Sequence, residues 1–350
     1  MKIVVIGYYG MGNIGDDLML RSLLLHFGGD RSVGSVTVVC NNNYYEPFPK
    51  TRFISSGISG KFKKLLALCQ ADLVCFGGGT CIGEQADNSG MFQLLQILKL
   101  CARLNVPFAF FAIGIGTVAS HEIKRIALEI LNRARYISFR DDDSLAVARN
   151  VLGFSGACTS CGDLAALGWR RLVTSRHSAW RGEISFSGVF GQTPEVAKHW
   201  GGVLATLVAE LGVRINFLPA HSREKDDNRF HHQISLYLKP GSYIIHSLAT
   251  PFEFIPILGR MDLHIGMRLH SVIIADILGI PNIAVEYSPK VAFYLRKSGV
   301  PLAPRLVQLK GHVNSERVQH VYATYKQPTA FLDAEEKAAR ESLEELLATF

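Results

Sequence analysis

The chain has 350 residues, of which 48% are hydrophobic and 19% are charged. This composition excludes a disordered or low-complexity protein and predicts a compact α/β protein with two domains, each able to bury its own core. The net charge of +7 suits anionic ligands or an anionic membrane surface. No block of Lys and Arg interleaved with aromatic residues is present, so we expect no nucleic-acid partner.

Short apolar runs rich in Val, Ile and Phe alternate with helical patterns over the first half of the chain. The predicted strands are 2–7, 35–40, 71–79, 107–116 and 135–140, and predicted helices include 91–104 and 122–134. Continuously apolar strands separated by helices are typical of a parallel sheet whose two faces are both covered. We therefore predict a doubly wound, Rossmann-like lobe over residues 1–170.

A basic stretch with few strand-forming residues interrupts this alternation near residues 166–183. The alternation then restarts, with predicted strands in 184–191, 213–221, 242–249, 261–271 and 282–290. A second Rossmann-like lobe is predicted over residues 180–320. Residues 331–350 are predicted to form a closing helix that starts with a capping box, Asp333 with Glu336.

The first predicted strand is followed by the pattern Gly10-x-Gly12-x-x-Gly15, which is typical of dinucleotide-binding loops. The second strand, however, ends in asparagines rather than in the acid that would hold a ribose, and Asp16 and Asp17 occupy the place of a pyrophosphate. These acids could simply cap the following helix. They could also face a neutral ligand with hydroxyl groups, such as a sugar, and this is the interpretation that we favour.

Two further predicted strands end in glycine-rich loops. One ends in residues 77–80, which include Gly78 and Gly79, and the other in residues 114–116. The carboxyl edge of a parallel sheet is where open α/β folds bind ligands, and glycine lets a ligand approach the main chain. Ordinary tight turns explain one such loop easily and several less easily.

Arg268 and His270 lie between a predicted strand and an apolar predicted helix, so both are expected at the sheet edge near the helix N-terminus. Such an arginine offers a planar fork for a carboxylate or phosphate, and such a histidine can transfer protons near neutral pH. A structural histidine is the alternative. Lys290 follows the next strand and is either a third ligand-binding residue or a solvated turn residue.

The other chemistry-bearing residues point to no further site. His264 is expected to pack within its strand, and the neighbouring His231 and His232 are expected to face solvent. Cys158 and Cys161 have the spacing of a redox pair or of half a zinc site, but no partner pair follows, so no metal is predicted. The other cysteines lie mostly in apolar runs, which suits a reducing cytosol. No signal peptide is expected, and residues 106–119 fall short of the ~20 needed to span a bilayer.

Several segments resemble the polysaccharide pyruvyl transferase family, in family order over most of residues 3–297. They are GYYGMGNIGDD, FGGGT, AIGIG, SFRDDDS with Arg140, FLPAH followed by Asp226, and IGMRLHSVIIADILGIPNIAVEYSPKVAFYL. The glycine-rich segments are weak signals, whereas residues 266–270 with the downstream Gly-Ile-Pro and Pro-Lys are specific. On this resemblance, the first glycine loop only looks like a dinucleotide fingerprint.

The resemblance implies a glycosyltransferase B-like fold, with the active site in the cleft between two Rossmann-like lobes. It also implies transfer of the enolpyruvyl unit of phosphoenolpyruvate to two sugar hydroxyls, which releases phosphate and leaves a pyruvate ketal, in surface or extracellular polysaccharide biosynthesis. The partners would be phosphoenolpyruvate and an oligosaccharide or lipid-linked sugar, with no cofactor. The location would be the cytoplasm, with peripheral association at the inner face of the membrane as a variant, and the oligomeric state stays open.

The resemblance also assigns roles to individual residues. The catalytic residues would be His270 and Arg268, and the second lobe would be the donor side. The implied donor-binding residues are Arg268, Leu269, His270, Lys290 and Arg140. The implied acceptor-binding residues, on the first lobe, are Gly10, Asn13, Gly15, Asp16, Asp17, Gly78 and Gly79.

Two departures from the family pattern bear on this assignment. The first strand of the second lobe lacks the arginine that family members often carry, so Arg181 or Arg140 would have to supply its charge. Ser288 also replaces an aspartate before Pro289 and Lys290. Two alternative functions remain, a nucleotide-sugar glycosyltransferase with the same fold and a catalytically silent sugar-binding relative.

Overall fold

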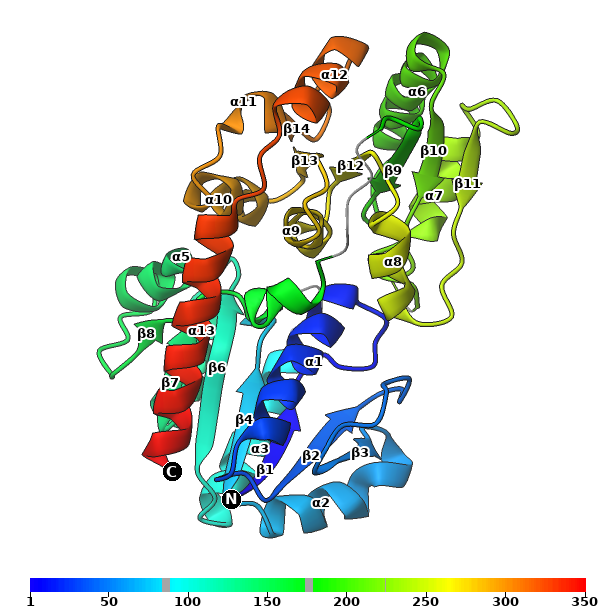
Figure 1. Ribbon diagram of the computed structural model, residues 1–350. Helices are drawn as coiled ribbons and strands as arrows, with labels where there is room; N and C mark the ends of the chain where they lie inside the picture. Colours follow the sequence, from blue (N-terminus) through cyan, green and yellow to red (C-terminus); the bar gives the residue numbers. More distant parts are fainter. Residues whose placement is uncertain (84–88, 174–178, 224) are drawn as a thin grey trace. The chain divides into compact units, whose positions relative to one another are not determined.

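The computed structural model describes residues 1–83, 89–173, 179–223 and 225–350. These residues form two compact units, each built on a parallel sheet (Figure 1). The first unit comprises Met1–Met11, Asp16–Leu167 and Ala334–Phe350, and the second comprises Gly12–Gly15 and Gly168–Asp333. The chain therefore enters the second unit for four residues of the first glycine loop, long before it builds the rest of that unit.

Within the described ranges, the first unit has an eight-stranded parallel sheet in the order β3-β2-β1-β4-β6-β7-β8, with β5 paired to β6 beside this row. Its strands are β1 (Lys2–Ile6), β2 (Ser35–Cys40), β3 (Thr51–Ser55), β4 (Leu73–Gly77), β5 (Thr80–Ile82), β6 (Phe108–Ile115), β7 (Tyr136–Phe139) and β8 (Thr159–Ser160). Its helices are α1 (Ile14–Gly29), α2 (Lys61–Cys69), α3 (Ser89–Arg103), α4 (His121–Asn132), α5 (Asp142–Ala146) and most of α13 (Thr329–Thr349).

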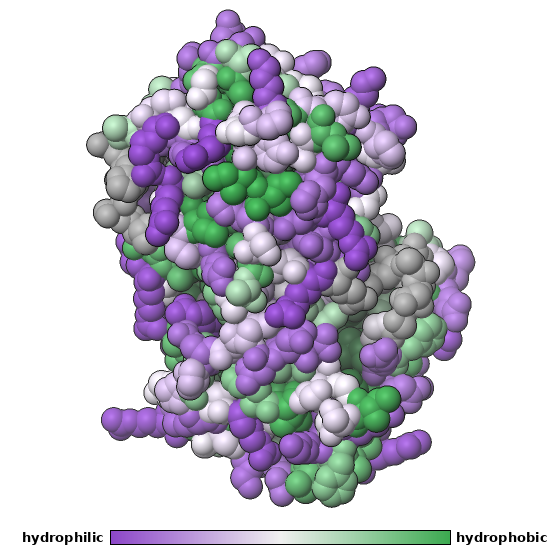
Figure 2. All heavy atoms as spheres, turned by 90° about the vertical axis from the view of Figure 1, so that its right-hand side faces the viewer, coloured by the Kyte–Doolittle hydropathy of each residue, from purple (hydrophilic) through white to green (hydrophobic). Residues whose placement is uncertain are grey.

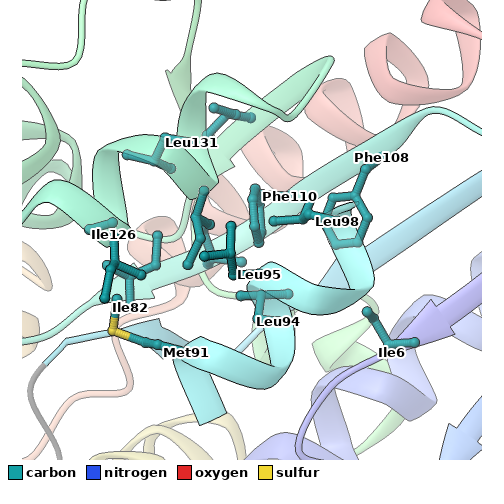
Figure 3. Packing of buried hydrophobic residues seen from close by; sticks show 14 of the residues in the cluster. Ile6, Ile82, Met91, Leu94, Leu95, Leu98, Phe108, Phe110, Ile126 and Leu131 are labelled. Atoms are coloured by element: carbon teal, nitrogen blue, oxygen red, sulfur yellow. The ribbon is translucent and has the colours of Figure 1, made fainter. Parts of the chain in front are cut away.

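Side-chain alternation along the strands gives the first sheet an apolar layer on each face. Val4 and Ile6 of β1 belong to the core cluster that α3 and α4 cover. Figure 3 shows α3 presenting one apolar stripe to this cluster, at the helical spacing of Met91, Leu94, Leu95 and Leu98. Helices α1 and α13 lie side by side on the sheet (Figure 1). His26 of α1 is close enough to Arg340 and Glu344 of α13 for their charges to affect its pKa.

The second unit has a six-stranded parallel sheet in the order β11-β10-β9-β12-β13-β14, counted over its described residues. Its strands are β9 (Glu183–Ser187), β10 (Arg214–Phe217), β11 (Tyr243–Ile245), β12 (Leu263–Gly266), β13 (Asn282–Glu286) and β14 (Leu306–Gln308). Its helices are α6 (Pro194–Leu211), α7 (Asn228–Ser235), α8 (Phe254–Leu258), α9 (Leu269–Ile277), α10 (Pro289–Lys297), α11 (Leu302–Arg305) and α12 (Ser315–Thr324). Phe186, Trp200 and Phe217 anchor its core with aromatic contacts.

The predicted fold class, two Rossmann-like parallel sheets with covering helices, is confirmed. The strands that the sequence did not predict are β3, β5, β8 and β14, which are only five, three, two and three residues long. None of them lies in a continuous apolar run like those that predicted the other strands, since β3 begins with Thr51 and Arg52 and the other three have only two or three residues. The predicted capping box is wrong, because α13 begins at Thr329 and Asp333 lies inside it, where its carboxylate binds Arg170.

None of the helices in the described part of the chain combines the length and the apolar character needed to cross a bilayer.

Candidate functional site

The order of strands reverses direction between β9 and β12 in the second sheet. From β9 the chain builds outward through β10 and β11, and it then returns to place β12 on the other side of β9. Open parallel sheets bind ligands beyond the carboxyl ends of the strands at such a reversal. Gly266 pairs with Ser187 at this edge, and Met267 donates its N–H to the carbonyl of Ser187 at 2.9 Å. Arg268 and His270 follow directly, so the structure places both at the predicted edge.

Arg268 binds a carboxylate of the same unit. Its Nε donates to Oδ2 of Asp227 at 2.8 Å, and its Nη2 donates to Oδ1 at 2.7 Å. Asp227 is completely buried, and it also accepts the N–H groups of Phe190 and His221, each at 2.9 Å. Four hydrogen bonds thus join the ends of β9, β10 and β12 through one side chain. Two N–H groups of the guanidinium that we expected to bind the anionic donor substrate therefore already donate to Asp227.

Asp227 is a site residue that sequence reasoning missed. The resemblance had drawn attention to Asp226, whose Oδ1 instead accepts the N–H of Asn228 at 3.0 Å as α7 begins. The sequence gives no reason to prefer one of two successive aspartates, and they differ in the structure because Asp227 is completely buried whereas Asp226 is only half-buried. A buried acid next to a strand end is a signal for a positioning role, because an ion of this kind needs a partner to be stable.

Helix α9 starts immediately after the Asp227–Arg268 ion pair. Arg268 is the residue before its first turn, and its carbonyl accepts the N–H groups of Ser271 at 3.0 Å and Val272 at 3.3 Å. Leu269 and His270 are therefore the first two helical residues. The N–H groups of a first helical turn have no partners within the helix and favour an anion. The backbone at Leu269 thus adds positive potential beside the imidazole.

His270 packs against the first glycine loop. A Cβ atom added to Gly15 would lie 2.1 Å from Nδ1 and 2.3 Å from Cγ of His270, so only glycine leaves room for the ring. The loop is fastened to this unit by its backbone, since Ile14 donates to the carbonyl of Ala220 at 3.0 Å. Asn13 also forms an antiparallel bridge with His221. The structure therefore places Gly15 against His270 and Asn13 against His221, although both loop residues were assigned to the first lobe.

Two buried histidines, His231 and His264, form hydrogen bonds with residues of the strands and loops at this edge. His231 accepts the N–H of Gly188 on Nε2 at 2.9 Å, which leaves the proton on Nδ1, 2.9 Å from Oδ1 of Asn228. The expectation that His231 faces solvent is wrong, since burial on the inner side of α7 lowers its pKa to about 3. His264 packs within β12 between the hydroxyls of Ser185 and Ser271, at 2.9 and 3.0 Å. His232, by contrast, is exposed.

The remaining cations proposed for the donor lie at different places. Lys290 is exposed in the first turn of α10, at the same sheet edge as Arg268, with Nζ 5.6 Å from the ring centre of Tyr287. Arg181 precedes β9 and is tied to Asp262, which precedes β12, by its N–H at 2.9 Å. Because β9 and β12 are parallel, Arg181 lies at the opposite edge and cannot supply the missing charge beside Arg268.

The structure offers another cation near the end of β9. Arg229, in the first turn of α7, holds its guanidinium carbon 5.3 Å from the ring centre of Phe190, in the loop that follows β9. Within β9 itself, Ser187 is buried and donates its hydroxyl to the carbonyl of Leu218 at 2.6 Å. Sequence reasoning missed Arg229 because it lies far along the chain from the strand that it neighbours.

In the first unit, Asp17 is part of the fold. Its side chain is completely buried, and it accepts the hydroxyl of Tyr44 at 2.5 Å, the hydroxyl of Tyr45 and the N–H of Gly10 at 3.1 Å. Burial raises the pKa of this carboxyl from 3.8 to about 6. The expectation that Asp17 faces a ligand is wrong, and so is the alternative that it caps a helix, because α1 begins three residues earlier.

The other predicted glycines of the first unit pack against protein atoms. A Cβ atom on Gly10 would lie 2.3 Å from the carbonyl oxygen of Asn42, and one on Gly78 would lie 2.9 Å from Sδ of Met19 in α1. Both have positive φ, +72° and +71°. Backbone conformation and close packing therefore account for glycine at both positions.

A charged cluster occupies the carboxyl edge of the first sheet. A Cβ atom on Gly79 would lie 2.7 Å from Oδ1 of Asp16, and one on Gly114 would lie 2.8 Å from Nη2 of Arg140. The Nε of buried Arg140 lies 3.1 Å from Asp141. Asp163 lies 3.7 Å from the same atom. The structure thus brings Asp16, Gly79 and Arg140 to one edge, next to strands β4, β6 and β7.

No group of three or more His, Cys, Asp or Glu side chains in the four described ranges is placed to hold a metal ion. A surface cavity of about 540 Å³ lies in the second unit and shares no lining residue with this site. It is lined by residues that include Ser298, Arg305, His320, Tyr325, Lys326 and Phe331.

Comparisons with known proteins agree with this geometry. The sequence model of the polysaccharide pyruvyl transferase family matches residues 13–289, a stretch that contains both Gly15 and His270. No curated protein matches the chain by sequence.

Solved structures resemble the chain over nearly its whole length. HepE from Anabaena, in complex with UDP-glucose, has a TM-score of 0.58 at 13% identity, over 98% of this chain and 95% of its own. The UDP-GlcNAc 2-epimerase of Neisseria meningitidis, bound to UDP-GlcNAc, has a TM-score of 0.60 at 10% identity, over 99% and 100%. Sucrose-phosphate synthase from Thermosynechococcus elongatus has a TM-score of 0.58 at 12% identity, over 99% and 95%. At these identities the likeness shows the fold alone, the glycosyltransferase B arrangement.

Proposed function

Because the chain belongs to the polysaccharide pyruvyl transferase family, we propose that it transfers the enolpyruvyl unit of phosphoenolpyruvate to two hydroxyls of a sugar. The product is a cyclic pyruvate ketal, and phosphate is released. The acceptor is an oligosaccharide or a lipid-linked sugar of a surface or extracellular polysaccharide. The reaction calls for no redox cofactor.

One observation carries the proposal, the position of His270 at the strand reversal of the second sheet. The imidazole stands in the first turn of α9, next to an arginine whose orientation is set by two hydrogen bonds to Asp227. Gly15, which has no side chain, lies directly against one side of the ring. A group that moves protons must be held in position and remain close to positive potential when its substrate is an anion. These residues meet both conditions.

The chemistry needs two proton transfers. One acceptor hydroxyl adds to C2 of phosphoenolpyruvate while C3 takes up a proton and becomes a methyl group. The bond from C2 to the phosphate oxygen then breaks, the second hydroxyl adds to C2, and its proton leaves with the phosphate. In this scheme His270 exchanges protons with the hydroxyls and C3, and Arg268 with the N-terminus of α9 stabilises the negative charge that develops on the departing phosphate.

The charge of phosphoenolpyruvate needs more cations than Arg268 offers, because two donor groups of Arg268 already hold Asp227. Lys290 lies at the same edge of the second sheet, and Arg229 stands beside the loop after β9. We assign donor binding to these two residues together with Arg268. Arg140, which pairs with Asp141 at the edge of the first sheet, keeps its proposed role in binding.

The test is an assay of purified protein with phosphoenolpyruvate and a panel of oligosaccharide acceptors. Phosphate release that depends on the acceptor, together with a ketal detected by mass spectrometry, is the expected result. The His270→Gln variant serves as the control for contaminating phosphatase. Binding of phosphoenolpyruvate without turnover on any acceptor would instead support a silent sugar-binding relative.

A nucleotide-sugar glycosyltransferase is the second candidate, since HepE and the Neisseria epimerase were solved with UDP-sugars. Release of UDP from a UDP-sugar in the same assay, with no use of phosphoenolpyruvate, would favour it.

A further inference from the structure

Helix α2 of the first unit carries large apolar side chains on its outer face. Phe62 is 76% exposed, and Leu65 and Leu66 are each 45% exposed. Ile58, one turn earlier in a short 3-10 helix (Ile58–Gly60), is 82% exposed. The spacing of Phe62, Leu65, Leu66 and the exposed Cys69 is i, i+3, i+4, i+7, which places them on one stripe of the helix. We call Ile58, Phe62, Leu65 and Leu66 the α2 face.

The fold of the first unit does not need the α2 face. The inner side of the same helix, Ala67 and Leu68, is buried in the core cluster. An amphipathic helix needs only one apolar face to pack on its own domain, and its other face is normally polar. Contiguous exposed apolar residues rimmed by polar ones mark an interaction surface.

The charges around the α2 face have one sign. Residues 47–71 contain no Asp or Glu, and their basic residues are Lys50, Arg52, Lys61, Lys63 and Lys64. Lys61 and Lys63 are exposed on the helix itself. Lys64 is half-buried and donates to the carbonyl of Ser56 at 2.8 Å. Figure 2 shows hydrophobic and hydrophilic side chains together at the foot of the view, the end at which Figure 1 draws α2.

We propose that the α2 face docks the chain onto a bilayer surface that contains anionic lipids. Apolar side chains between lysines fit this surface, because the apolar groups enter the boundary between headgroups and acyl chains while the lysines meet lipid phosphates. A second copy of the chain fits poorly, since a two-fold contact would set the same lysines against one another. The docking does not depend on the proposed reaction.

The experiment is sedimentation of the full chain with vesicles of phosphatidylcholine containing phosphatidylglycerol, compared with vesicles of phosphatidylcholine alone. The wild type is expected to bind the anionic vesicles and to be released by salt. A Lys61→Ala, Lys63→Ala variant should bind about 25-fold more weakly, at about fivefold per lysine. An Ile58→Ser, Phe62→Ser variant should lose at least about tenfold, because it removes two large inserted side chains.

The matched control is Leu236→Ser in the second unit, whose side chain is 81% exposed and therefore equally free to be replaced. It should bind the anionic vesicles like the wild type. Equal binding to neutral vesicles, or variants that bind as well as the wild type, would overturn the proposal. A dimer in sedimentation equilibrium that the Phe62→Ser change abolishes, without vesicle binding, would assign the face to a second copy instead.

Discussion

Arg268 and Asp227 are joined by two parallel hydrogen bonds of 2.8 and 2.7 Å, although they are 41 residues apart in the chain. Asp227 is completely buried, and Arg268 retains 18% of its side-chain exposure. The pair ties the residue before α7 to the residue before α9. The ion pair therefore fixes where α7 and α9 begin, on either side of the strand reversal. Because His270 is the second residue of α9, the pair also fixes its position.

A double-mutant cycle on this pair tests whether it positions the site. Asp227→Asn leaves a partly buried guanidinium without its counter-charge and should lower the free energy of unfolding by about 3 kcal/mol. Arg268→Lys keeps a charge but loses the fork, so it should also be destabilising and should weaken donor binding. Urea titrations of the four proteins should give a coupling of about 1–3 kcal/mol. Additive effects would show that the two residues act separately.

The contact between Gly15 and His270 predicts a specific effect of one methyl group. Gly15→Ala would place Cβ 2.1 Å from Nδ1 of His270, so the ring must move. Turnover should fall by roughly 100-fold, the order of loss that follows from misplacing a catalytic group by about 1 Å. The matched control is Gly29→Ala at the far end of the same helix, where an added Cβ meets no atom within 4 Å. Equal activity of the two variants would show that the contact between Gly15 and His270 does not affect turnover.

The His270→Gln variant separates catalysis from structure. If His270 moves protons, turnover should fall by roughly 10²- to 10⁴-fold, the usual share of general acid–base catalysis, while phosphoenolpyruvate binding changes little. Calorimetric titration and thermal unfolding provide the two further readouts. A variant that unfolds at a lower temperature but keeps normal activity per folded molecule would make His270 a structural residue.

The buried carboxyl of Asp17 predicts a dependence of stability on pH. Its pKa is raised from 3.8 to about 6, so between pH 4 and 6 the folded protein binds a proton that the unfolded chain does not. The stability contributed by this group is therefore fully present below pH 4 and is lost as the pH rises through 6. The loss amounts to about 3 kcal/mol. Asp17→Asn should remove this component, which urea titrations at pH 4 and pH 7 measure. An unchanged pH profile would mean that the carboxyl titrates normally.

The sequence by itself determined the architecture and the place of the strongest motif. Continuously apolar runs rich in Val, Ile and Phe, such as 107–116, alternate with helical patterns and so predict strands covered on both faces, and parallel strands bring their carboxyl ends to one edge. The positions of Arg268 and His270 after such a strand therefore predicted their location at that edge. Local patterns suffice here because strand burial and helix start are decided by neighbouring residues.

Only the tertiary structure decided what these side chains touch. The partner of Arg268 is Asp227 and not its neighbour Asp226, and the glycine against His270 comes from the beginning of the chain. The burial of Asp17 was likewise hidden, because two tyrosines that follow β2 cover it. The partners and the burial of a side chain depend on which distant parts of the chain pack together. The periodicity of a single segment does not predict that packing.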